Sequence, residues 1–280
     1  MNEAAMLRYF FMLKQRVQAR TGRDLVLAIG VGLILGGLLL ISLFVFLHLF
    51  VLVCILVGVT CLAEIFTATH TRGIFIVRPF LTLSTVVLPV LAFFFASWFL
   101  PSIAFFMLTI LLAQFFLRAR FSLHSLFIFL YIPITVSLFA FIAAHPTGRL
   151  WVFFMLVTVI ASDTFSYVFG TLFGRHLLAP RISPNKTWEG LIGGFFSSLF
   201  FGTLTGILLL HKSLLFSATA ASILFLFAIL GDLAESYIKR RLGVKDMSGI
   251  LPGHGGMLDR VDSMLLNIFP ILLLVHMNFV

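Results

Sequence analysis

Acidic side chains are few in this chain, and most of them fall toward its C-terminal end. Seven of the ten Asp and Glu residues lie between positions 163 and 262. These seven are Asp163, Glu189, Asp232, Glu235, Asp246, Asp259 and Asp262. Carboxylates are costly in an apolar environment and mark a functional site by default, although some of them could simply neutralise nearby Lys and Arg. Carboxylate oxygens are also the ligands that Mg²⁺ prefers, so the group predicts metal-assisted chemistry.

The spacing of the acids predicts how they are presented. Asp232 and Glu235 are three residues apart, and Asp259 and Asp262 repeat that spacing. Residues three apart share one face of a helix. Two helix ends could therefore offer these four carboxylates to a metal cluster that lies between them.

Glycines and basic residues around the acids suit phosphate groups. The run from Gly253 to Gly256 allows the backbone to approach phosphate oxygens closely, and His254 within it can donate a hydrogen bond. A lone histidine is more often structural, but the flanking glycines, acids and bases favour a substrate contact here. The helix expected from position 261 begins with free backbone N–H groups, which also suit a phosphate. Countercharge for a triphosphate and a phospholipid headgroup comes from Lys186, Lys239, Lys245 and Arg260.

The composition is that of a membrane protein. Of 280 residues, 61% are hydrophobic and 10% charged, whereas a water-soluble domain carries about a quarter charged residues. The mean hydropathy is +1.17. The net charge is +9, and without an extramembrane domain to hold a nucleic-acid fold it favours anionic lipids and substrates over nucleic acid as partners. The two cysteines, Cys54 and Cys61, fit no metal or redox spacing and are expected to pack inside the bundle.

Runs of apolar residues predict an all-α fold, a polytopic transmembrane helical bundle of about nine spans, because crossing a bilayer takes roughly 20 such residues. The chain reads as one integral-membrane domain, 1–280, with a basic arm at 1–23 and a motif-bearing catalytic region at 160–263. The apolar run between Asp24 and Glu64 is too long for one span and is divided near Ser42. The expected spans are 25–41, 44–63, 80–98, 101–117, 122–144, 150–173, 190–210, 214–238 and 261–279.

The positive-inside rule places the N-terminus on the cytoplasmic side. With this orientation, 17 Lys and Arg residues fall in cytoplasmic segments, and only Arg149 and Lys212 fall outside. Three patches of polar residues, at 163–175, 183–190 and 231–263, then converge on the cytoplasmic face. We expect the active site at this face of a bacterial cell (inner) membrane.

Small residues recur at every fourth position of one expected span. They are Gly190, Gly194, Ser198, Gly202 and Gly206. On a helix they form one face that lets another backbone approach closely. We expect this face to serve packing, against a helix of the same chain or of a second chain.

The segment from Ser236 to Asp262 resembles the signature of the phosphatidate cytidylyltransferase family, also called CDP-diacylglycerol synthases. The matching positions are Ser236, Lys239, Arg240, Lys245, Asp246, Leu251, Pro252, His254, Gly255, Gly256, Asp259, Arg260 and Asp262. The segments Asp163-Thr164 and Ser183 to Gly190 are also similar to family motifs. A signature with this many fixed positions is far more specific than a short phosphate loop.

The resemblance implies transfer of CMP from CTP to phosphatidate in phospholipid biosynthesis, with Mg²⁺ as the cofactor and, often, a homodimer. In the implied mechanism the phosphatidate phosphate attacks the α-phosphorus of CTP in line, and the protein supplies positioning and charge neutralisation. The catalytic residues would be Asp232, Asp259, Lys245 and Asp246, and the metal ligands Asp232, Asp259, Asp262 and Asp163. The substrate-binding residues would be Ser183, Asn185, Lys186, Thr187, Ser236, Lys239, Arg240, His254, Gly255, Gly256 and Arg260.

Two functions of other classes remain as alternatives. A CTP- or ATP-dependent lipid-alcohol kinase of a related membrane fold would use similar residues on a hydroxyl substrate. That hydroxyl would call for a general base, and the long signature argues against it. A transporter would also explain intramembrane carboxylates, but it would scatter them across repeats rather than gather them at one end.

Overall fold

The computed structural model describes residues 25–116, 123–180, 182–251 and 255–277. The basic arm predicted at 1–23 and the predicted substrate residue His254 lie outside the described residues. The first helices are α2 (Leu25–Phe44), α3 (Leu47–His70), α4 (Arg78–Phe94) and α5 (Ala96–Phe116). A continuous segment follows, formed by α6 (His124–Phe129), the π-helix η1 (Leu130–Ile134) and α7 (Thr135–Ala144). The C-terminal half holds α8 (Gly148–Phe173), β1 (Leu177–Ala179), β2 (Ser183–Thr187), α9 (Trp188–Leu208), α10 (Leu214–Leu242) and α11 (Leu258–Met277).

The predicted fold class, an all-α polytopic membrane protein, is confirmed. Each expected span falls on a helix, and the long N-terminal apolar run breaks at Val45 and Phe46, close to the predicted position. Among the described residues, six helical segments are long and apolar enough to cross a membrane, namely α3, α5, α6 to α7, α8, α9 and α10. The total of nine spans and the cytoplasmic N-terminus remain predictions.

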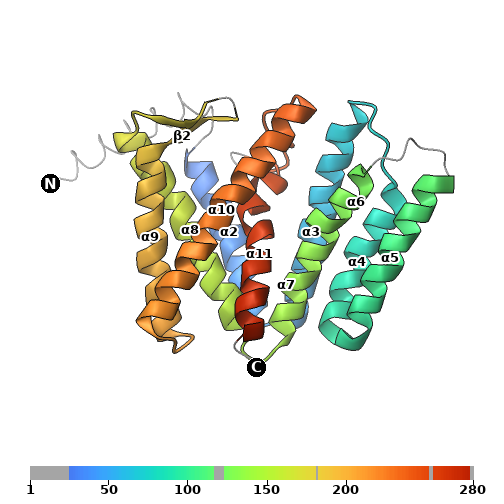
Figure 1. Ribbon diagram of the computed structural model, residues 1–280, viewed down its shortest axis with the longest axis horizontal. Helices are drawn as coiled ribbons and strands as arrows, with labels where there is room; N and C mark the ends of the chain where they lie inside the picture. The colour runs from blue at the N-terminus through green and yellow to red at the C-terminus, as the bar shows by residue number, and fades with distance from the viewer. Residues whose placement is uncertain (1–24, 117–122, 181, 252–254, 278–280) are drawn as a thin grey trace.

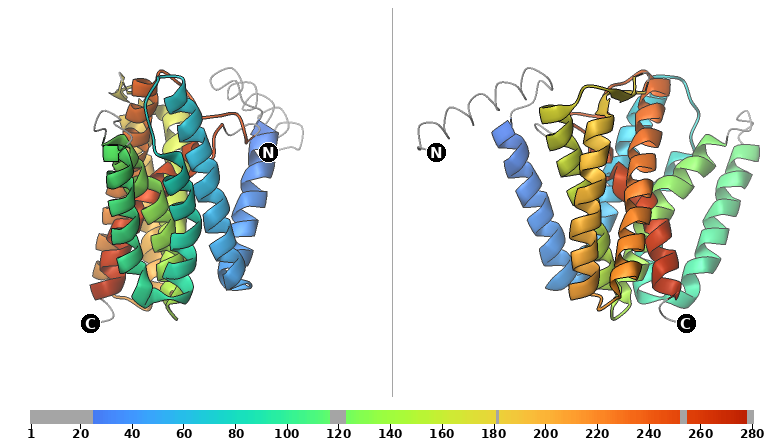
Figure 2. Two further views of the ribbon diagram at one scale, coloured as in Figure 1. Left: turned by 90° about the vertical axis from the view of Figure 1, so that its right-hand side faces the viewer. Right: turned by 60° about the vertical axis from the view of Figure 1, so that its left-hand side comes forward.

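Large apolar side chains face outward on the outer helices, as expected where lipid is the solvent. Leu100 and Phe116 of α5 and Phe200 of α9 are all more than half exposed. Inside the bundle, Phe50, Phe129 and Phe154 are almost completely buried. The free cysteines Cys54 and Cys61 are buried as well, which agrees with the predicted packing role. Helix α2 stands at the edge of the bundle beside α3 (Figure 2).

The connections alternate between the two ends of the bundle. The turn at 71–77, the β1–β2 hairpin and the residues 243–251 and 255–257 lie at one end, which we call the hairpin end (Figure 1). The turns at 145–147 and 209–213 lie at the opposite end. Among the described residues, Arg149 and Lys212 are the only Lys and Arg at that opposite end. The grouping of polar patches and basic residues at one end is therefore the predicted one.

The small-residue face of α9 packs within the same chain. A Cβ atom built on Gly194 would lie 1.9 Å from Ser166 Oγ of α8. A Cβ atom on Gly202 would lie 2.8 Å from Thr158 Oγ1 of α8 and 2.7 Å from Ala221 Cβ of α10. The predicted packing role is confirmed, and the partner helices are α8 and α10.

Candidate active site

The β1–β2 hairpin brings the second polar patch onto α10. The strands pair antiparallel, with Leu177 opposite Thr187 and Ala179 opposite Ser183. Lys186 in β2 forms an ion pair with Asp232 in α10. Farther along α10, Arg240 Nε donates to the Ile182 carbonyl oxygen at 3.3 Å. Two cationic side chains thus join the hairpin to the helix that carries the third patch.

The base of the hairpin is fixed by the start of α9. The Glu189 carboxylate accepts the backbone N–H groups of Arg175 and His176 at 3.1 and 3.2 Å, and it contacts His176 Nδ1 at 2.6 Å. Thr187, predicted to bind substrate, is the N-cap of α9, where its Oγ1 accepts the Gly190 N–H at 3.2 Å. The Thr187 hydroxyl therefore helps to aim β2, and with it Lys186, toward α10.

Carboxylates from three helices lie in the same region below the hairpin. Asp163 of α8, Asp232 of α10 and Asp262 of α11 interact electrostatically with one another. The helices α10 and α11 approach closely here, because a Cβ atom on Gly231 would lie 2.7 Å from the Asp262 carbonyl oxygen. Within α10, the Ser236 hydroxyl donates to Asp232 Oδ1 at 3.4 Å. This placement brings the first and third polar patches together, as expected.

A second charged group surrounds Lys239. Its ammonium group pairs with Glu235 on the same helix and with Asp259 Oδ1 of α11, the latter at 2.9 Å. The other oxygen of Asp259, Oδ2, accepts the backbone N–H groups of Met247 and Gly256 at 3.1 and 2.7 Å. Both carboxylate oxygens of Asp259 are therefore engaged by donors of the chain itself.

The oxygen donors at this end fit a hard cation such as Mg²⁺. Among the described residues no three His, Cys, Asp or Glu side chains form a ready-made metal cluster. Mg²⁺ commonly binds through one or two carboxylates and substrate phosphates instead of a protein cage. Asp232, whose side chain is 31% exposed, and Asp163, which is exposed, are open to such a cation. Asp259 would have to release Lys239 before it could take part.

The start of α11 differs from the expectation of free backbone N–H groups. The Gly256 N–H donates to Asp259, and those of Met257 and Leu258 donate to the carboxylate of Glu64 at 2.7 and 2.9 Å. Carboxylates of the chain thus occupy the place that a phosphate was expected to take. A helix N-terminus attracts any anion, and the sequence alone does not show which one is near.

The remaining predicted site residues lie around these groups at the hairpin end. Asn185, Arg240 and Lys245 are exposed, whereas Ser183, Asp246 and Arg260 are partly buried. Gly255 has a φ angle of +90°, a conformation that favours glycine, and its backbone pairs with that of Leu251. All of these residues belong to segments at the hairpin end of the bundle.

Two residues of the N-terminal half belong to this region although the sequence analysis assigned them no role. Glu64 of α3 holds the start of α11. Tyr131 lies in the π-helix η1 and is 6% exposed. Its hydroxyl has no hydrogen-bond partner among the described residues, and the side chain lies in the same region as the carboxylates of Asp262, Glu235 and Asp232. A single acid inside an apolar span was a usable signal for Glu64; the π-helix was not readable from the sequence.

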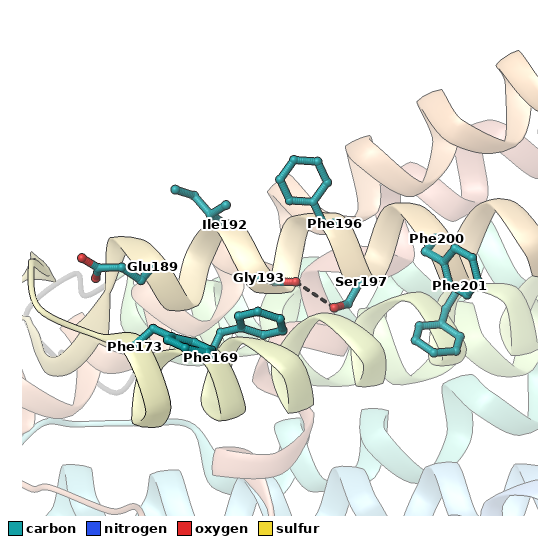
Figure 3. Close-up of a pocket in the computed structure, with 9 residues that line it drawn as sticks. All are labelled: Phe169, Phe173, Glu189, Ile192, Gly193, Phe196, Ser197, Phe200 and Phe201. Carbon is teal, nitrogen blue, oxygen red and sulfur yellow. Dashed lines mark hydrogen bonds between the residues drawn. The ribbon is translucent and has the colours of Figure 1, made fainter.

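An apolar groove runs along the outer face of α8 and α9 (Figure 3). Phe169 and Phe173 of α8 line it, and a Cβ atom on Gly193 of α9 would lie 2.4 Å from the Phe169 ring. Its polar groups are few, with Glu189 at the hairpin end and Ser197 bonded to its own helix. Such a surface suits hydrocarbon, and the groups that suit phosphate lie between α8, α10 and α11.

Comparison with known proteins gives one consistent family. A model described as the cytidylyltransferase family matches residues 26–278. A phosphatidate cytidylyltransferase of Mycobacterium bovis is 40% identical over 141 residues, which cover 50% of this chain and 46% of that protein. That of Mycobacterium leprae is 42% identical over 141 residues, covering 50% and 45%. That of Staphylococcus haemolyticus is 44% identical over 142 residues, covering 49% and 54%. The chain thus matches about half the length of these relatives.

Proposed function

The chain belongs to the cytidylyltransferase family, and we propose that it transfers CMP from CTP to phosphatidate, giving CDP-diacylglycerol and pyrophosphate. The observation that carries the proposal is the ion pair of Lys186 with Asp232 at the hairpin end, in the region that also holds Asp163 and Asp262. Carboxylates able to share a cation, next to a lysine able to bind phosphate, are what a reaction between two phosphates requires. The names of the relatives support this choice of substrates.

In the proposed reaction a phosphatidate phosphate oxygen attacks the α-phosphorus of CTP. The new P–O bond forms as the bond between the α-phosphorus and the oxygen that bridges to the β-phosphorus breaks, and pyrophosphate leaves. A phosphate is already ionised at neutral pH, so the attack needs no strong general base. The work left to the protein is to align the two substrates and to offset their negative charges.

The described side chains supply these two contributions. Lys186 and Arg260 both interact electrostatically with Asp163, so they lie where phosphate oxygens would gain from their charge. We propose Mg²⁺ as the cofactor, held by Asp232 with Asp163 and Asp262 and with Asp259 as a further candidate. When bound, Mg²⁺ supplies positive charge to the phosphate oxygens. Lys239 holds Asp259 at the start of α11 and so keeps that helix end in place.

We further propose that the protein resides in a bacterial cell (inner) membrane with the hairpin end on the cytoplasmic side. Within the part of the chain that the structure describes, nine Lys and Arg residues lie toward the hairpin end and only Arg149 and Lys212 lie at the other, which supports this orientation. CTP is a cytoplasmic nucleotide, and phosphatidate would enter from the adjacent leaflet. A homodimer is proposed on the family resemblance alone.

The proposed function is tested by a matrix of substrates with the purified protein. Four nucleoside triphosphates are combined with phosphatidate, diacylglycerol or a polyprenol, with and without Mg²⁺. We expect turnover with CTP and phosphatidate, and only when Mg²⁺ is present. Turnover of diacylglycerol or polyprenol in place of phosphatidate would contradict the proposal and favour a lipid-alcohol kinase.

A further inference from the structure

A buried carboxylate of the N-terminal half reaches into the region proposed to bind substrates. Glu64 of α3 is 2% exposed. Its Oε1 accepts the Ser248 hydroxyl at 2.6 Å and the Met257 N–H at 2.7 Å, and its Oε2 accepts the Leu258 N–H at 2.9 Å. One side chain of α3 therefore bonds to both the middle and the end of the segment 243–257.

The same carboxylate leaves no room for a side chain at Gly256. A Cβ atom there would lie 2.9 Å from both oxygens of Glu64 and 3.0 Å from Asp259 Oδ2. The backbone of Gly256 is thus enclosed by two carboxylates, one from α3 and one from α11. The backbone donors around it bond to different carboxylates. The Gly256 N–H donates to Asp259, whereas the N–H groups of Met257 and Leu258 donate to Glu64.

The beginning of the segment is also held from the end of α3. Arg72, just after α3, donates from Nε to the Leu242 carbonyl oxygen at 2.8 Å. Leu242 is the last residue of α10, and a cationic group is favourable at a helix C-terminus. Gly243 follows with a φ angle of +70°, and a Cβ atom there would lie 1.6 Å from Arg72 Nη2.

We infer that Glu64 and Arg72 are positioning residues that hold residues 243–251 and 255–257, and with them Lys245 and Asp246, in the arrangement needed for CMP transfer. This inference rests on the proposed function. It adds a residue of α3 and one of the turn after α3 to a candidate active site otherwise formed by the C-terminal half of the chain. Neither residue is assigned to touch substrate; each acts through the backbone that it binds.

The test compares Glu64→Gln with the wild-type protein in two measurements. Glutamine keeps the size of the side chain but offers one acceptor oxygen, so it cannot serve both the Met257 and the Leu258 N–H groups together with Ser248. We expect amide hydrogen exchange to rise about tenfold or more at Met257 and Leu258, the effect of losing a buried hydrogen bond to a charged group. We expect kcat for CTP and phosphatidate to fall by roughly 100-fold, the scale of a misplaced reacting group, while KM for phosphatidate changes less.

Further variants keep the test decisive. Ser248→Ala removes one of the three bonds and should show a smaller change of the same kind, even if Glu64→Gln folds poorly. The double variant should be less than additive in kcat, because both changes act on one unit. Arg72→Gln should raise exchange at Gly243 and Val244. Arg78→Gln is the control: the Arg78 side chain stacks on Phe66 of α3, and its loss should leave exchange at Gly243 and Val244 unchanged.

The outcomes separate the inference from the proposed function. Faster exchange confined to 243–258, together with a lower kcat, would support the inference. Unchanged exchange there, exchange raised equally throughout the bundle, or a native kcat despite faster local exchange would overturn it. A wild-type protein without cytidylyltransferase activity would contradict the proposed function, and the exchange measurement would still decide whether Glu64 holds the segment.

Discussion

Lys186 of the β1–β2 hairpin forms an ion pair with Asp232 of α10, which joins the second polar patch of the sequence to the third. The pair lies where Asp232 also interacts with Asp163 of α8 and Asp262 of α11. A cation that binds these carboxylates and a phosphate that binds Lys186 would each replace part of this pairing. We therefore expect this ion pair to be broken, at least in part, when the proposed substrates bind.

Asp232→Asn tests the role of this carboxylate. The change keeps the size of the side chain but removes a unit of negative charge, so the proposed cation loses a partly exposed ligand that also pairs with Lys186. We expect kcat to fall by at least about 10²–10³-fold, as when one stabiliser of a transition state is lost. Raising the Mg²⁺ concentration should restore part of the activity. Near-native turnover by a purified, folded variant would show that Asp232 does not hold the cation.

Lys239→Gln tests whether the buried ion pairs stabilise the fold. The side chains of Glu235 and Asp259 are 0% and 3% exposed, and Lys239 is the cation that pairs with both. Its loss leaves buried negative charge without compensation, which costs about 3–5 kcal/mol in proteins. We expect a clearly lower free energy of unfolding in detergent. Lys245→Gln is the matched control, because Lys245 is exposed, and its stability should stay close to that of the wild type.

Gly202→Leu tests the packing of α9 against α8 and α10. A Cβ atom added to Gly202 would lie within 3 Å of Thr158 and Ala221, so a leucine side chain would force the helices apart. Overpacking of this kind costs about 1–3 kcal/mol or more, and the thermal midpoint in detergent should drop. Gly37→Leu in α2 is the control, since a Cβ atom on Gly37 meets nothing within 4 Å. Equal midpoints for both variants would mean that the α9 contact is loose.

The orientation of the bundle is tested with reporters at its two ends. Nine spans place the N-terminus in the cytoplasm and Val280 outside, so reporters fused at these positions should read as cytoplasmic and non-cytoplasmic. A reporter in the turn at 209–213, beside Lys212, should also read as outside. Matching sides for the two termini would contradict the count of nine spans.

The helices of the bundle were predictable because each needs its own run of apolar residues. The convergence of Lys186, Asp163 and Asp232 was predictable in outline, since their segments fall at the same end of an alternating bundle. What the sequence did not show is which side chains pair with each other. Asp259 is predicted to be a metal ligand, and the sequence did not show that its oxygens also contact Lys239 and two backbone N–H groups.

The positions of Glu64 and Tyr131 were not predictable for a different reason. Both come from the N-terminal half, and their positions near the acids depend on how α3 and the η1 segment pack against α11. Neither apolar periodicity nor residue spacing specifies such contacts between distant helices. A lone glutamate in an apolar span signals that a partner exists, but only the packing shows that the partner is the start of α11.

The fate of the CTP phosphates tests the central claim most directly. The purified protein is supplied with phosphatidate, Mg²⁺ and CTP that carries a radioactive label on either the α- or the γ-phosphate. Cytidylyl transfer predicts that the α-label enters the lipid product and that the γ-label leaves as pyrophosphate. Entry of the γ-label into lipid, or no entry of the α-label, would contradict the account.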